Sequence, residues 1–131
     1  MSDNTRRALG ATLLVSVALA LCAVVRGDGA DGMAGRPTLA LGSDGVAGAF
    51  SRVGPRLSVE GGSSVEMRFE SVGRGERVDL TAEASPVRVG DEVRYDRAPG
   101  VTEWWRSVPG GLEQGLTIEE RPAGAGSLDV A

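Results

Sequence analysis

From Arg56 onward, apolar and polar residues alternate over several short stretches. Leu57 and Val59 are separated by a polar residue, and Val65, Met67 and Phe69 are separated by charged ones. A period of two places apolar side chains on one face of an extended segment and polar side chains on the other. This pattern is typical of antiparallel strands with one buried face.

Turn residues separate these stretches. Gly-containing segments interrupt the alternation at 73–76 and 90–91, and Ala98-Pro99-Gly100 has the Pro-Gly order that type II turns favour. Further strands are expected at 78–80, 87–89, 93–95, 101–106, 112–119 and 128–131. About seven short strands at this spacing predict an all-β fold, an antiparallel sandwich or rolled sheet. Because the last stretch ends without a turn residue, we expect the module to continue in a longer protein.

The first 27 residues have another pattern. Arg6 and Arg7 precede an uncharged apolar run from Ala8 to Val25. This order predicts a hydrophobic signal helix, so we expect the protein to be secreted or to reside in the cell envelope. We expect this leader to be cleaved from the mature protein. The alternatives are that residues 8–25 are retained as a membrane anchor, or that Cys22 is lipidated. Contact with a membrane is expected only through this leader.

A flexible linker is expected between the leader and the strands. Residues 28–49 are rich in Gly, Ala and Asp, and such a composition buries too little surface to offset its ordering entropy. The aspartates in it do not have the alternate spacing of a calcium loop. The predicted organisation is therefore a leader at 1–27, a linker at 28–49 and a β-rich module at 50–131.

Charge and composition exclude several classes of function. The chain carries 14 basic residues, all arginine, against 18 acidic ones, and its net charge is −4. An acidic body lacks the basic surface that nucleic-acid binding requires. The chain has no histidine, and its single cysteine, Cys22, lies in the leader. We therefore expect no catalytic residue, no metal site and no cofactor in the module.

The pair Trp104-Trp105 is the main candidate for packing or binding. Neighbouring residues in a strand point to opposite faces, so Glu103 and Trp105 share one face and Thr102 and Trp104 share the other. One indole is expected to fill the core, and the other to cover a sheet edge or a neighbouring domain. Sugar stacking, and a glycosidase cleft that uses Glu103, are the alternatives. Gln114 is expected to be a buried amide that pairs with backbone.

Two adjacent segments carry a resemblance to a known family. Thr102-Glu103-Trp104-Trp105 and the stretch from Gly111 to Thr117 resemble the N-terminal region of secreted bacterial proteins with FG-GAP (integrin-alpha-like propeller) repeats. Trp105 stands where that family more often has Tyr, and Leu116 where it has Phe. Both changes keep a large apolar side chain.

The resemblance implies a non-catalytic structural or adhesion module whose partners are propeller repeats further along the same protein. Two other interpretations remain open. One is a self-contained extracytoplasmic domain that binds a surface glycan or a protein. The other is an extracellular hydrolase.

Overall fold

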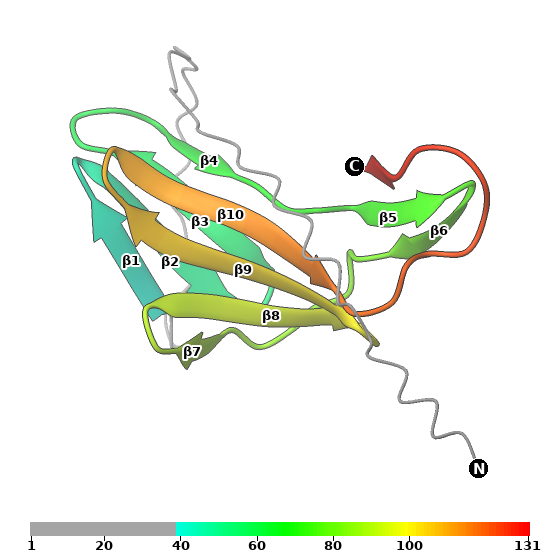
Figure 1. Ribbon diagram of the computed structural model, residues 1–131. Helices are drawn as coiled ribbons and strands as arrows, with labels where there is room; N and C mark the ends of the chain where they lie inside the picture. Colours follow the sequence, from blue (N-terminus) through cyan, green and yellow to red (C-terminus); the bar gives the residue numbers. More distant parts are fainter. Residues whose placement is uncertain (1–38) are drawn as a thin grey trace.

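The computed structural model describes residues 39–131, which form eleven β-strands and no helix (Figure 1). Two four-stranded sheets pack face to face, and a third sheet of three strands lies at one end of them. All paired strands are antiparallel. The prediction of an all-β antiparallel fold is confirmed for these residues. The predicted signal helix at 1–27 and linker residues 28–38 lie outside the described residues.

The first sheet begins inside the segment that was expected to be a linker. Its strands, in spatial order, are β1 (Leu39–Ser43), β2 (Val46–Ser51), β3 (Gly54–Val59) and β4 (Ser64–Glu66). Asp44 and Gly45 join β1 to β2 with φ values of 48° and 77°, and a type I′ hairpin turn requires both to be positive. Strands therefore replace the expected linker over residues 39–49, and the module extends beyond its predicted start at residue 50.

The second sheet contains the residues singled out in the sequence. Its strands, in spatial order, are β10 (Gly111–Ile118), β9 (Val101–Val108), β8 (Glu92–Ala98) and β7 (Val87–Val89). Pro99 and Gly100 form the turn between β8 and β9, and Gly100 has the positive φ of 72° that a type II turn needs. The turn predicted from the Pro-Gly order is thus confirmed.

The third sheet covers the far end of the second one. Its strands, in spatial order, are β11 (Asp129–Val130), β5 (Ser71–Arg74) and β6 (Glu76–Asp79). Figure 1 shows this small sheet beyond the ends of β9 and β10. Phe69, Val72 and Leu80 pack there against residues of β9 and β10.

Two apolar cores result. The first lies between the four-stranded sheets and contains Leu41, Phe50, Leu57, Val93, Tyr95 and Trp105. The second lies under the third sheet and contains Phe69, Val72, Leu80, Val101, Leu116 and Ile118. The inner face of the second sheet contributes to both cores, so this sheet holds the module together.

Hydrogen bonds also close one edge of the sandwich. The turn between β1 and β2 meets the turn between β9 and β10: the Ser43 hydroxyl donates to the carbonyl oxygen of Val108 at 2.7 Å. The Asp44 carboxylate accepts a hydrogen bond from the Gly110 amide. The two sheets are therefore tied together at this edge by groups about 65 residues apart in the chain.

Some strands differ from the sequence-based prediction. Residues 39–131 form more strands than the seven expected, and the strand predicted through Phe69 ends at Glu66. Val65 and Val78, which alternation placed inside, are 36% and 44% exposed. Both lie on short edge strands, β4 and β6, where no further strand or sheet covers the side chain.

A glycine in the middle of β2 provides a test of this packing. A Cβ at Gly48 would lie 2.8 Å from Phe50 Cε2 and 2.9 Å from Leu112 Cδ1, whereas a Cβ at Gly42 on β1 would make only ordinary contacts. We expect Gly48→Ala to lower the free energy of unfolding by about 1–3 kcal/mol because it overpacks the core. Gly42→Ala, the matched control, is expected to change it by less than about 1 kcal/mol. Urea unfolding of both variants measures the difference, and equal midpoints would contradict the packing described.

Candidate functional site

The two tryptophans lie on opposite faces of β9, as alternation predicted. Trp105 is buried in the first core, with its ring 5.7 Å from that of Phe50 in an edge-to-face arrangement. Trp104 lies on the outer face of the second sheet. Glu103 shares the inner face with Trp105 and is 0% exposed. The shared faces of Glu103 and Trp105, and of Thr102 and Trp104, are therefore confirmed.

The Glu103 carboxylate accepts hydrogen bonds from three side chains. Oε2 accepts from Arg97 Nε at 2.7 Å. Oε1 accepts from Trp105 Nε1 at 2.7 Å and from Gln114 Nε2 at 3.0 Å. A carboxylate buried in protein is costly unless it is paired and hydrogen-bonded, and these donors meet both conditions.

Arg97 provides the compensating charge. Its side chain is 3% exposed, and its guanidinium carbon lies 4.1 Å from the centroid of the Tyr95 ring. This distance permits a cation–π interaction. The position of Arg97 follows from alternation along β8, because it comes two residues after Tyr95, which also faces inward. The signal that could have identified this arginine in the sequence is the continued alternation beyond Tyr95.

The Gln114 amide pairs differently from the prediction. It is buried, as expected, and it shares a face with Leu116. Its side chain, however, donates to Glu103 and not to backbone. The reason is the register of β9 and β10: Gln114 lies opposite Trp105, next to the carboxylate that needs a second donor on Oε1.

This arrangement does not suit Glu103 for acting on a substrate. Both oxygens accept hydrogen bonds from protein side chains, and no surface of the residue reaches solvent. A glycosidase carboxyl must contact the sugar bond. The geometry favours a structural role for Glu103 at the seam between the two cores.

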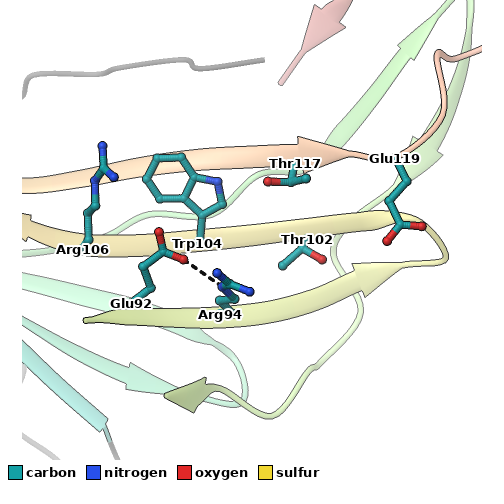
Figure 2. A pocket seen from close by; sticks show the side chains of 7 residues that line it. All are labelled: Glu92, Arg94, Thr102, Trp104, Arg106, Thr117 and Glu119. Carbon is teal, nitrogen blue, oxygen red and sulfur yellow. Dashed lines mark hydrogen bonds and ion pairs between the residues drawn. The ribbon is translucent and has the colours of Figure 1, made fainter. Parts of the chain in front are cut away.

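The outer face of the second sheet contains a shallow groove of about 400 Å³ (Figure 2). Strand β8 contributes Glu92 and Arg94 to it, and β9 contributes Thr102, Trp104 and Arg106. Thr117 on β10 and Glu119 just after it complete the lining. The volume falls within the range of about 300–1,000 Å³ typical of small-ligand sites.

Trp104 forms the floor of this groove. Gly115 lies on β10 directly opposite Trp104. A Cβ at Gly115 would overlap with the indole ring, so the ring requires glycine at that position. The Arg106 guanidinium carbon lies 5.1 Å from the indole centroid. Trp104 is only 7% exposed. It therefore presents a narrow apolar strip in place of the open ring face that the sugar-stacking alternative assumed.

Both arginines in the groove are held by neighbouring glutamates. Arg94 Nε donates to Glu92 Oε2 at 2.8 Å, and Arg106 Nε donates to Glu113 Oε2 at 2.6 Å. The hydrogen bond that Arg106 donates to the Glu113 carboxylate raises the pKa of Arg106 above its usual value. The two arginines and their glutamate partners were missed in the sequence because they come from three strands, although alternation puts them on one face.

Within residues 39–131, no three His, Cys, Asp or Glu side chains come together as a metal site would need. The same residues contain no helix with the length and apolarity to span a bilayer.

Removing Glu103 tests the buried network. We expect Glu103→Ala to lower the free energy of unfolding by about 3–5 kcal/mol because Arg97 is left buried without its partner. The control is Glu83→Ala, which breaks a half-exposed pair with Arg52 at 3.9 Å and should cost less than about 1 kcal/mol. The double variant Arg97→Met/Glu103→Met should lose less than the sum of its single changes. Additive losses in urea unfolding would contradict this coupling.

Tyr95 gives a pH-dependent test. Burial raises the pKa of its phenol well above 10, and the hydroxyl donates to the Ser51 carbonyl oxygen at 3.0 Å. The unfolded chain loses this proton near pH 10 while the folded chain keeps it, so stability should be full below about pH 10 and fall above it. Because the chain has one tyrosine, ultraviolet titration of phenolate reads this group alone. Folded and urea-unfolded protein that titrate at the same pH would contradict the burial of Tyr95.

No family model, curated protein or solved structure that was compared with the chain matches it.

Proposed function

We propose that this chain is a non-catalytic β-rich module of an exported protein, with a structural and interaction role. The observation that carries the proposal is the state of Glu103. This carboxylate, adjacent in sequence to the two tryptophans, is fully buried, and its two oxygens accept hydrogen bonds from Arg97, Trp105 and Gln114. Such a group stabilises a fold and is not available to a substrate.

The resemblance to FG-GAP repeat proteins supports the more specific form of this proposal. In that form the module follows a leader, folds outside the cytoplasm and adjoins propeller repeats of the same protein. The segments that carry the resemblance lie in β9 and β10, which are paired neighbours in the second sheet. Reading the coding sequence beyond the codon for Ala131 tests this form, because propeller repeats should follow there.

The second candidate function is a self-contained extracytoplasmic domain that binds a glycan or a protein. The groove over Trp104 favours it, because the groove is concave and lined by polar side chains from three strands. The hydrolase alternative has the least support, since Glu103 is remote from solvent.

Export is tested with alkaline phosphatase, which is active only outside the cytoplasm, fused after Ala131 of the full chain in a bacterial host. We expect active fusions, and loss of activity when the apolar run at 8–25 is deleted. Equal activity with and without residues 8–25 would overturn the proposed export. Turnover of a polysaccharide by the purified chain, abolished by Glu103→Gln, would overturn the non-catalytic role.

A further inference from the structure

We propose that the groove on the outer face of the second sheet binds a neutral, hydroxyl-rich saccharide. The inference rests on the proposed interaction role, and it assigns that role to a place and a chemical class of ligand. The groove lies on the face opposite the buried network, so a ligand can enter it without disturbing Glu103.

The two arginines supply fixed hydrogen-bond donors. Each guanidinium is anchored through Nε, Arg94 to Glu92 and Arg106 to Glu113. The terminal Nη1 and Nη2 groups of Arg94 donate no hydrogen bond within residues 39–131. An arginine held in place by a neighbour loses less conformational entropy when its remaining N–H groups bind a ligand.

The other end of the groove supplies hydroxyl groups and an acceptor. Figure 2 shows Thr102, Thr117 and Glu119 beyond Trp104, on the side away from Arg106. The Thr117 hydroxyl and the Glu119 carboxylate have no hydrogen-bond partner among the described residues. Donors therefore dominate one end of the groove and acceptors the other.

The balance of charge favours a neutral ligand. Glu92 and Glu113 offset the positive charges of Arg94 and Arg106, and Glu119 adds a negative charge that no ion pair offsets within residues 39–131. The groove therefore carries no excess of positive charge that would favour an anionic ligand. A sugar hydroxyl both donates and accepts, so a row of hydroxyls can use the arginine donors and the glutamate acceptor together.

The groove suits a saccharide better than a peptide. Its floor consists of β8, β9 and β10, which are paired with one another, so an extended peptide lying across the groove could join a strand only at the outer edge of β10. The lining also lacks a deep apolar pocket for an anchoring side chain, because Trp104 is packed on Gly115. The exposed strip of indole suffices to contact the C–H groups of a sugar ring.

Titration calorimetry of the full chain tests the proposal. The probes are neutral tetrasaccharides of glucose, mannose and galactose, a galacturonate tetrasaccharide and an acidic peptide. We expect at least one neutral probe to bind, with an affinity that changes less than about twofold when salt rises from about 0.05 to 0.5 M. Tryptophan fluorescence should change on binding, since Trp104 lines the groove.

Two variants locate the binding. Arg94→Ala removes charge-assisted donors and should weaken binding about tenfold or more. Thr117→Val should weaken it about threefold to tenfold. The matched control is Arg56→Ala on the first sheet, where Arg56 Nε likewise donates to a neighbour, Ser64 Oγ at 3.1 Å, and binding should not change.

Three outcomes would overturn the inference. They are the absence of binding by every neutral probe, tighter and salt-sensitive binding of galacturonate or of the acidic peptide, and neutral binding that Arg94→Ala leaves unchanged. None of these affects the phosphatase or turnover assays. A failed saccharide site is therefore distinguishable from a failed proposal of an exported, non-catalytic module.

Discussion

The rest of the module depends on one buried negative charge. Glu103 lies on the central strand β9, opposite Tyr95 on one side and Leu116 on the other, and these two belong to different cores. A carboxylate at this place must find donors, and Arg97, Trp105 and Gln114 provide them from β8, β9 and β10. The network therefore fixes the register of three strands. An apolar residue at the same position would tolerate a slip that this carboxylate does not.

Alternation along β9 gives the two faces of this strand different roles. Residues of β9 that point inward join the sandwich, and residues that point outward line the groove. The two adjacent indoles share a residue type but not a role. Trp105 donates its N–H to Glu103, whereas Trp104 lies over Gly115 beneath Arg106. Substitutions on the outer face can thus change binding while the core remains intact.

Alternation and turn chemistry predicted β8, β9 and β10 well, because these strands are long and one face is buried, but Val87 and Val89 on the short edge strand β7 are exposed. They predicted the faces of Glu103, Trp104 and Trp105 and the turn at Pro99-Gly100. The first hairpin was missed because its outward residues are Gly and Ala, so composition obscured the Asp44-Gly45 turn. The partners of Arg97 and Gln114, and the groove itself, depend on strand register and on pairings between distant residues, which periodicity does not encode.

The contact between the first and last hairpin turns has a consequence for synthesis of the protein. Ser43 hydroxyl meets the Val108 carbonyl across 65 residues of chain, and the inner face of β1 and β2 packs on strands made later. Contacts between residues so far apart in the chain slow folding, because the entropy of closing a long loop is lost before these contacts form. Until β8 to β10 have been synthesised, the apolar side of the first sheet stays uncovered. This side is the surface that a chaperone would have to shield during synthesis.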